Sequence, residues 1–404
     1  MFVVYICAPE LSMESSPNLS FDDTAVAFKY KSDAALKKAN FIFTLVNHPW
    51  ISSVATGAVK FALKYGLPVE GIIRKTAFSH FCGGESIATS DPVIQTLWRH
   101  GVFTILDYSA EGESTEEGFD RTLEETLRIV NKAKSSPEIP FAVFKPSGLA
   151  SVDILAKVQS KEAMSAEEKR AFDRIRERFL AICEAGYKND VPVLIDAEET
   201  WIQDPIDSLV YEMMERFNKE KAIVFNTYQL YRTAGLRNLR EAHHLATMHN
   251  YFLGAKLVRG AYMEKERARA EEMGYASPIH PDKNATDDAF NQALMFCLDN
   301  KQRITTLSGT HNEYSNYFLT VLMEKHGLKP NDRRVWFAQL YGMSDNISFN
   351  LAKAGYAVAK YVPYGPVKSV MPYLLRRAEE NTSVAGQSSR ELTLIRKELK
   401  RRRS

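Results

Sequence analysis

The sequence predicts an α/β fold, a (β/α)8 barrel of the TIM type with an N-terminal helical segment and a final helix over the barrel mouth. Short runs of β-branched and aromatic residues recur eight times between capped helical segments, over about 280 residues, which is the size and rhythm of such a barrel. No GxGxxG motif follows any of these runs, so a doubly wound sheet is only the second interpretation.

The 404 residues divide into three expected parts. These are an N-terminal helical region at 1–100, the barrel at 101–383 and a basic C-terminal helix or tail at 384–404. In the first part, apolar residues recur at helical spacing in Thr24–Ala39, Phe43–Val54 and Ala55–Tyr65. Met13 begins an ordinary polar stretch, and residues 1–12 are interpreted as a start-site artefact rather than native sequence.

The barrel elements are placed by strand composition and by capping residues. The expected strands are Val102–Tyr108, Phe141–Lys145, Val191–Ile195, Ala222–Tyr228, Ala255–Val258, Ile304–Leu307, Val335–Leu340 and Tyr356–Val362. The expected helix starts are Ser165 with Glu168 as a capping box, Asp204-Pro205, Thr286, Ser344 and Ser369, with ends near Gly186, Asn300 and Gly355. Pro372 is expected in the first turn of the helix that Ser369 caps, where its missing N–H costs nothing.

Composition excludes several classes of protein. The net charge of +2 is a balance of 52 basic and 50 acidic residues, which gives no attraction to nucleic acid. The 4 cysteines form no CxxC pair, as expected in a reducing compartment without structural zinc. No apolar run reaches the roughly 18 residues of a spanning helix, and no basic segment precedes the first apolar run. We therefore expect a cytoplasmic protein.

Polar side chains follow nearly every expected strand, at the end of the barrel where TIM-barrel active sites lie. They include Lys145, Asp196, Gln229, Lys256, Arg259, Thr310 and His311. Each has an ordinary alternative, such as a loop histidine or a lysine that extends to solvent. No HExxH, GxSxG or P-loop is present, so a metal site and common hydrolase chemistry are not expected. Cations, amides and aromatic rings instead suit an anionic planar cofactor and a carboxylate substrate.

The helix after the last strand carries two adjacent arginines. Tyr373, Arg376, Arg377 and Glu380 recur at i, i+3, i+4 and i+7 and therefore share one stripe. Two guanidinium groups beside a tyrosine ring form a good receptor for a small carboxylate. On spacing alone, a solvated face with salt bridges is the better interpretation, but the position directly after the eighth strand favours a place over the barrel mouth.

The chain resembles the proline dehydrogenase family in the motifs around these residues. Members of that family are flavoenzymes that oxidise L-proline to Δ1-pyrroline-5-carboxylate. The resemblance runs from about Val102 to Ser383 and is closer to the mitochondrial-type branch. It rests on IDAEE (195–199), KLVRGAY (256–262), GTHN (309–312), QLYGM (339–343), YVPYG (361–365) and YLLRRAEEN (373–381). It implies a barrel, FAD as cofactor, a quinone as electron acceptor, and hydride transfer from proline C5 to flavin N5 as the first step of proline catabolism.

The resemblance also implies roles for single residues. Asp196 and Lys256 are the implied catalytic residues, although many bacterial members carry arginine in place of Lys256 and lysine in place of Arg259. The implied substrate-binding residues are Lys145, Leu340, Tyr361, Tyr373, Arg376, Arg377 and Glu380. The implied FAD-binding residues are Ala197, Gln229, Arg259, Gly260, Ala261, Thr310 and His311. No general base is apparent.

Other interpretations stay open at this point. A hydroxyproline dehydrogenase is expected to carry a smaller residue than Tyr361, so that residue favours proline. A non-redox aldolase or lyase would use Lys145 or Lys256 as a Schiff base. A third interpretation is a barrel that binds a metabolite without catalysing a reaction. The basic tail, with Leu392, Ile395 and Leu399 on one side, suits either peripheral contact with the inner face of a membrane or a solvated terminus.

Overall fold

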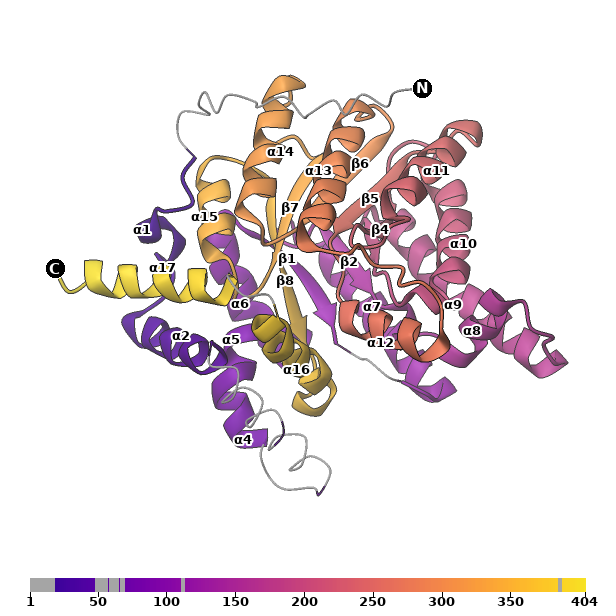
Figure 1. The fold of residues 1–404 in the computed structure, drawn as a ribbon, viewed down its shortest axis with the longest axis horizontal. Coiled ribbons are helices and arrows are strands. Elements are labelled where there is room, and N and C mark those ends of the chain that lie inside the picture. Colours follow the sequence, from indigo (N-terminus) through magenta and orange to yellow (C-terminus); the bar gives the residue numbers. More distant parts are fainter. Residues whose placement is uncertain (1–18, 48–56, 58–64, 66–69, 110–112, 384–386) are drawn as a thin grey trace.

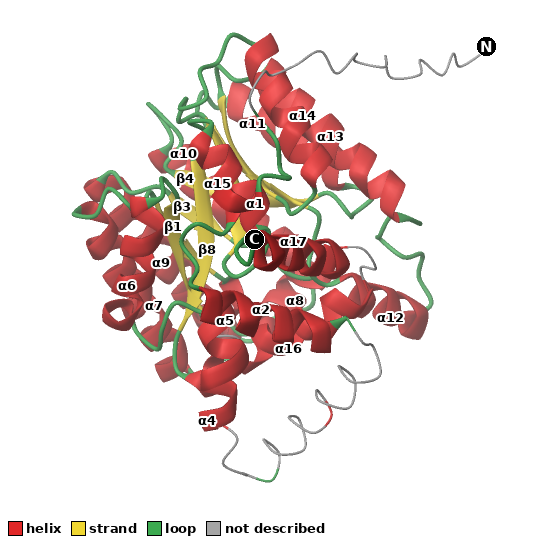
Figure 2. Ribbon diagram, turned by 90° about the vertical axis from the view of Figure 1, so that its left-hand side faces the viewer, coloured by secondary structure: helices red, strands yellow, loops and turns green. Residues whose placement is uncertain are grey.

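Eight parallel strands close into one barrel, in which each strand pairs with its neighbours in sequence and the last pairs with the first. The computed structural model describes residues 19–47, 57, 65, 70–109, 113–383 and 387–404. The strands are β1 (Phe103–Tyr108), β2 (Phe141–Phe144), β3 (Val193–Ile195), β4 (Val224–Gln229), β5 (Leu253–Val258), β6 (Ile304–Gly309), β7 (Val335–Leu340) and β8 (Val358–Tyr364). The predicted (β/α)8 barrel is confirmed, and all eight predicted strands overlap these bounds (Figures 1 and 2).

Helices cover the outside of the barrel (Figure 2). They are α6 (Ile87–Arg99), α7 (Glu116–Lys134), α8 (Val152–Ser160), α9 (Ala166–Asn189), α10 (Thr200–Phe217), α11 (Gly235–Met248), α12 (Met263–Met273), α13 (Lys283–Asp299), α14 (Glu313–Lys325) and α15 (Asp345–Lys353). Side chains on the outer strand faces and inner helix faces form one large apolar core. That core fixes the strands, so the polar groups at their ends are held on a rigid support.

The barrel interior below the strand ends is filled with large side chains. Phe141, Phe225 and Trp336 meet edge to face, with ring centroids 5.6 Å apart for Phe141–Phe225 and 5.0 Å apart for Phe141–Trp336. Such contacts stabilise by dispersion and by the favourable geometry of the ring quadrupoles. These rings therefore fill the interior toward the N-terminal ends of the strands, and the polar side chains lie toward the C-terminal ends.

A second apolar cluster joins the two ends of the chain to each other. The N-terminal elements are α1 (Thr24–Ala27), α2 (Asp33–Val46), α4 (Glu70–Ile73), a π-helix at Arg74–Phe78 and α5 (Ser79–Phe81), and the C-terminal ones are α16 (Val367–Ser383) and α17 (Gln387–Arg401). Figure 1 shows yellow α17 alongside indigo α2. Leu340 packs against both this cluster and the barrel interior, which places α16 over the barrel mouth.

The N-terminal region is described in part. Its first predicted helix, Thr24–Ala39, is divided at Ser32, which caps a new helix by accepting from the Ala35 N–H. Most of the predicted helix Ala55–Tyr65 and all of residues 1–12 lie outside the described residues.

The capping box of Ser165 with Glu168 is confirmed, but several other predicted helix boundaries are wrong. α9 continues past Gly186 to Asn189, and α13 begins at Lys283, where Asp282 rather than Thr286 is the cap. Pro205 is the sixth residue of α10 rather than the first. The Thr200 N–H and hydroxyl both donate to the Glu266 carboxylate on α12, so the true cap is tertiary and invisible to local spacing.

The two C-terminal helices also begin differently from their prediction. α16 starts at Val367, so Ser369 is not its cap and Pro372 lies beyond its first turn. On α17 the predicted apolar stripe is not exposed: Leu392 and Ile395 are buried against the N-terminal helices. That stripe is therefore unavailable to a membrane, because its surface is already covered by protein. None of the described helices combines the length and the apolar composition that crossing a bilayer requires.

Candidate active site at the barrel mouth

Four charged groups and one phenol meet inside the upper end of the barrel. Lys145 Nζ lies 3.0 Å from a carboxylate oxygen of Asp107 and 3.0 Å from Asp196 Oδ2. Lys256 Nζ lies 2.5 Å from the other oxygen of Asp196 and donates to the Tyr361 hydroxyl at 2.8 Å. That hydroxyl in turn donates to Asp196 Oδ1 at 3.0 Å. The structure thus brings together four residues from the predicted site, which come from β2, β3, β5 and β8.

The cluster is neutral as a whole because two ammonium groups alternate with two carboxylates. Burial alone would raise the pKa of Asp196, but Lys256 and Lys145 outweigh it and hold that pKa well below the usual value. Burial, with Asp196 and Asp107 nearby, raises the pKa of Tyr361 far above its usual value. The phenol therefore stays protonated and donates. Asp107 was missed by the sequence analysis, although a carboxylate near the end of an apolar strand is a usable signal.

A second buried acid, Glu198, is hydrogen-bonded to residues that follow β2 and end β4. Glu198 accepts from the Ser147 N–H at 2.8 Å and lies 3.3 Å from the Tyr262 hydroxyl. Its main-chain carbonyl accepts the Gln229 amide at 2.7 Å, which fixes the orientation of that predicted cofactor ligand. Burial raises the pKa of Glu198 to about 7. Sequence reasoning placed Glu198 within a motif but gave it no role.

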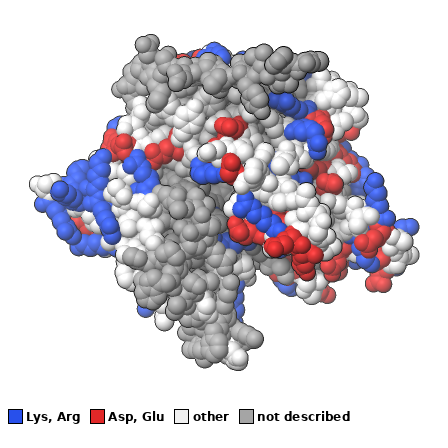
Figure 3. Space-filling view, viewed as in Figure 1, with Lys and Arg blue, Asp and Glu red and all other residues white. Residues whose placement is uncertain are grey.

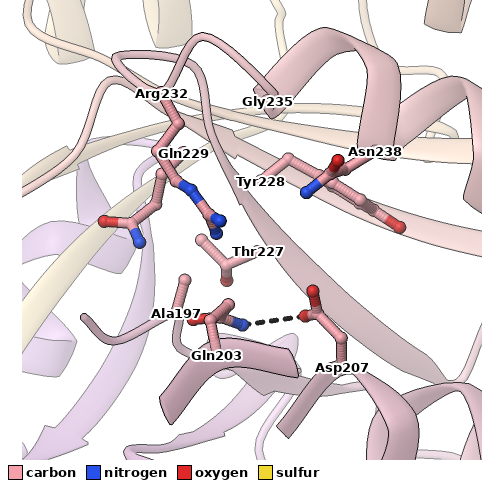
Figure 4. A pocket seen from close by; sticks show the side chains of 9 residues that line it. All are labelled: Ala197, Gln203, Asp207, Thr227, Tyr228, Gln229, Arg232, Gly235 and Asn238. Carbon is pink, nitrogen blue, oxygen red and sulfur yellow. Dashed lines mark hydrogen bonds between the residues drawn. The ribbon is translucent and has the colours of Figure 1, made fainter. Parts of the chain in front are cut away.

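A small cavity lies behind Gln229, between β4 and the helices α10 and α11 (Figure 4). It has room for about one water molecule. Its lining comprises Ala197, Gln203, Asp207, Thr227, Tyr228, Gln229, Arg232, Gly235 and Asn238. In Figure 4 the Arg232 guanidinium extends between Gln229 and Asp207. Asp207 accepts from Gln203 and Asn226, both at 2.8 Å, and burial raises its pKa to about 6. The predicted residue Ala197 therefore lines this cavity.

Arg259 anchors the ends of β5 and β6 to each other. Its guanidinium donates to Asp287 at 2.7 Å, to Ser315 at 3.1 Å and to the Thr310 hydroxyl. The predicted residues Arg259 and Thr310 are thus in contact. Gly260 has φ +141, and a Cβ there would lie 2.4 Å from the Tyr231 ring, so packing against Tyr231 already requires a glycine. Ala261 follows it in the loop to α12.

His311 joins the loop after β6 to the loop after β7. Burial, with the charges of Lys360, Arg377 and Arg259, lowers the pKa of His311 to about 3, so its imidazole is neutral. The Leu340 N–H, which can only donate, points at Nε2 from 3.5 Å. On its other side, His311 Nδ1 is hydrogen-bonded to the Ser344 hydroxyl at 2.9 Å. His311 and Leu340, both predicted site residues, are therefore neighbours.

The arginine helix α16 lies over this assembly. Tyr373 and Arg377 are buried, and the Arg377 guanidinium lies 5.3 Å from the Tyr373 ring centre. Such a cation–π contact holds the guanidinium in one orientation. Arg376 is half-buried on the same helix. The side chain of Glu380 lies outside the described part of the chain, so its pairing with the arginines stays a prediction.

An ion cluster that the sequence analysis did not anticipate supports the β7 side of the site. Lys360 on β8 points away from the barrel interior, and its Nζ lies 3.0 Å from Asp345 Oδ1. The same Nζ also donates to the main-chain carbonyls of Leu340 and Met343. Lys31, from the N-terminal segment, lies 2.8 Å from the same aspartate. Leu340, a predicted substrate-binding residue, is therefore held on its outer side by a buried ammonium group that contacts its main-chain carbonyl. Among the described residues, no group of three or more His, Cys, Asp or Glu side chains is arranged to hold a metal ion.

The family model for proline dehydrogenase matches residues 91–390. This chain belongs to the proline dehydrogenase family. The resemblance that its motifs indicated is thereby confirmed, and the family consists of oxidoreductases. The match covers the whole barrel and the arginine helix, so every predicted site residue lies inside it.

Individual relatives agree with this assignment. The chain is 37% identical to the carbapenem antibiotics biosynthesis protein CarD of Pectobacterium carotovorum, covering 82% of this chain and 86% of that one. It is 43% identical to mitochondrial proline dehydrogenase 1 of Homo sapiens and 41% identical to that of Caenorhabditis elegans, and it spans 40% of the length of each. The matched regions of the human and worm proteins cover 58% and 59% of this chain.

Solved structures confirm the fold independently. Proline utilization A from Bdellovibrio bacteriovorus, inactivated by N-propargylglycine, superposes with a TM-score of 0.69 at 21% identity. The superposition covers 92% of this chain and 40% of that one. At this identity the likeness concerns the barrel architecture alone.

Proposed function

We propose that this protein oxidises L-proline to Δ1-pyrroline-5-carboxylate with bound FAD, as the first step of proline catabolism. The observation that carries the proposal is the cluster of Lys145, Asp196, Lys256 and Tyr361 at the mouth of a barrel of this family, directly below the arginine helix. A small zwitterion suits this site, because buried cations and anions alternate within it.

The substrate carboxylate would be bound by Arg376 and Arg377. Guanidinium groups bind carboxylates through paired, charge-assisted hydrogen bonds, which also fix the orientation of the ring. Leu340 supplies an apolar wall, and the Tyr361 ring limits the space beside the charged cluster. Glu380 would balance the arginines, as its spacing on the helix predicts.

The residues at the ends of β4, β5 and β6 suit FAD chemically. Gln229 offers an amide already oriented by its bond to Glu198, Arg259 offers a guanidinium, and Thr310 and neutral His311 offer uncharged partners. When bound, FAD would supply the two-electron acceptor for the hydride that leaves proline C5. Lys256 would lie near the reacting edge of the flavin, where a cation favours negative charge on the reduced ring.

The ion pairs that both lysines make disfavour a Schiff-base enzyme. Lys145 and Lys256 each pair with Asp196, and a paired ammonium is a poor nucleophile because it must first lose a proton. The same pairs leave neither lysine as a ready base for the substrate amine. We propose that the amine proton leaves through solvent at the open barrel end.

The electron acceptor is proposed to be a membrane quinone, reached from the cytoplasmic side. Exposed basic residues gather toward the end of α17, namely Arg396, Lys397, Lys400, Arg401 and Arg403 (Figure 3). Such a cluster is attracted to anionic lipid without inserting an apolar face. Binding to anionic but not to neutral vesicles, lost at high salt, would support this contact.

A flavin spectrum tests the main proposal. The purified protein should be yellow, and anaerobic L-proline should bleach its visible flavin absorbance. 4-Hydroxyproline should bleach it much more slowly. A protein with bound flavin that proline leaves oxidised would contradict the substrate, and a colourless protein that borohydride traps on a carbonyl substrate would contradict the redox class.

A further inference from the structure

Two adjacent residues of α17 reach two different loops of the barrel mouth. The Arg390 guanidinium makes two hydrogen bonds to the Glu313 carboxylate, at 2.9 and 3.2 Å. Glu391 is buried, and its Oε2 accepts the Ser344 main-chain N–H at 3.0 Å. Glu313 begins α14 after β6, and Ser344 precedes α15 after β7. One turn of the C-terminal helix thus bridges the two loops.

These are the loops that hold His311. His311 lies two residues before Glu313, and its Nδ1 bonds to the Ser344 hydroxyl at 2.9 Å. Ser344 has φ +50, a left-handed conformation that is unfavourable for a residue other than glycine. The bond from its N–H to Glu391 favours this conformation, in which its hydroxyl is directed at the imidazole. Glu391 and Arg390 therefore act on the two ends of one contact.

Docking of α17 does not depend on Glu391. Leu392 and Ile395 are buried in the cluster with the N-terminal helices. At the other end of the helix, Glu398 holds Arg402, which donates to the main-chain carbonyls of Phe28 and Lys31 at 2.8 Å. A buried carboxylate is costly unless its hydrogen bonds are made, so an apolar residue at position 391 would suit docking alone better. The Glu391 carboxylate accepts the Ser344 N–H, and it also lies near the positive charges of Lys31 and Lys360.

We infer that Arg390 and Glu391 are positioning residues that set the location of His311 at the cofactor side of the site, so that the C-terminal helix is part of the active-site structure. This inference rests on the proposed function, in which His311 contacts FAD. It assigns a role to a segment that sequence spacing marked only as a basic tail. Neither residue touches the site itself, since each acts through a loop.

The first test uses hydrogen exchange and needs no cofactor. In the Glu391→Ala protein, amides of the β6 and β7 loops, 308–316 and 340–346, should exchange about tenfold faster than in the parent. Glu398→Gln is the matched control, because it removes a buried acid from the same helix without touching either loop. It should leave those amides unchanged. Equal acceleration by both variants, or none by Glu391→Ala, would overturn the inference.

The second test asks whether the effect passes through His311. Glu391→Ala should weaken FAD binding, measured by flavin fluorescence, by about tenfold, a typical cost of a misplaced ligand. In a His311→Ala background the same change should have less than about twofold effect, because the residue being positioned is gone. Equal effects in both backgrounds would overturn the inference. Glu391→Gln keeps an acceptor oxygen, so its affinity for FAD should lie between those of the parent and of Glu391→Ala. It replaces the alanine variant in this test if that variant does not fold.

The two proposals fail differently. If the protein binds no flavin and ignores proline, the proposed function fails, but the exchange experiment still decides whether α17 holds the loops. If flavin binds and proline reduces it, while Glu391→Ala behaves like Glu398→Gln, only the positioning role fails.

Discussion

Lys256 Nζ lies 2.5 Å from Asp196 Oδ1, across the barrel mouth from β5 to the end of β3. Because Lys145 holds the other oxygen of the same carboxylate, Asp196 is the shared anion of two lysines. The pairing fixes both ammonium groups before any ligand arrives. Preorganised charge of this kind is the main way in which an enzyme lowers the energy of a transition state, since no reorganisation is needed during the reaction.

Replacing Asp196 should therefore affect both stability and activity. Asp196→Asn keeps the shape but leaves two buried ammonium groups with only Asp107 to balance them. We expect a loss of about 3–5 kcal/mol in the free energy of unfolding, the usual cost of breaking a buried pair. Urea denaturation measures it. Glu184→Gln, which breaks an exposed pair with Lys188, is the control and should cost less than about 1 kcal/mol. Similar losses in both variants would contradict this account.

Glu198 should make the stability of the folded protein depend on pH, in a direction that its raised pKa determines. Its pKa is raised to about 7 in the folded protein by burial, above the value of 4.5 for a free carboxyl. Between these values the unfolded chain has lost a proton that the native state keeps, so stability falls as pH rises through this window. The Glu198→Gln side chain does not ionise, so the variant should not lose stability in this way as pH rises. It also keeps an acceptor oxygen for the Ser147 N–H.

The difference in melting temperature between Glu198→Gln and the parent should thus become more favourable to the variant from pH 5 to pH 8. Glu184→Gln, which removes an exposed acid paired with Lys188 and far from this group in the sequence, is the control. A difference that stays constant over this range would show that Glu198 is ionised throughout.

The sequence revealed the barrel because each strand is a short apolar run and many of the predicted site residues follow a strand, both of which are local patterns. Lys145, Asp196 and Lys256 could be placed together from topology alone, since parallel strands of a barrel end at one mouth. The helix boundaries that were predicted wrongly are those that local patterns do not determine. The start of α10 is capped by Glu266, 66 residues away, and no spacing rule detects such a partner.

The missed residues are those whose partners come from distant segments. Lys360 is a lysine within an apolar strand, and its partner Asp345 follows the predicted helix start Ser344 but was given no role. Glu391 lies in a helix whose composition suggested solvent or membrane. Both acquire their roles from the way the chain ends fold back over the β7 loop, which only the three-dimensional structure provides.

Tyr361 should control the choice between proline and hydroxyproline. Its ring lies 4.4 Å from Lys256 Nζ and is buried, so a substituent on the substrate ring competes with it for space. Tyr361→Ser should raise the ratio of kcat/KM for 4-hydroxyproline to that for proline by about tenfold, a typical gain from relieving one steric conflict. Tyr361→Phe keeps the bulk, loses only the hydroxyl and should leave the ratio unchanged. An equal change in both variants would assign selectivity to the hydroxyl instead.

Arg376 should bind the substrate and not the cofactor. If its guanidinium grips the proline carboxylate, Arg376→Ala removes a charge-assisted bond worth about 1.5–3 kcal/mol, and the KM for proline should rise by roughly 10- to 150-fold. Arg376→Lys should recover part of that loss, because a point charge replaces the bidentate fork. Lys368→Ala is the control for lost charge on the same helix, since Lys368 is exposed and pairs with Glu70.

The flavin content distinguishes the two possible roles of Arg376. All three proteins should keep bound flavin, with an unchanged absorbance spectrum before proline is added. Loss of flavin from Arg376→Ala alone would mean that α16 holds the cofactor and that the carboxylate is bound elsewhere. Competition by a proline analogue without a carboxylate provides the complementary measurement: its affinity should be insensitive to Arg376→Ala, because the group that the arginine binds is absent from that ligand.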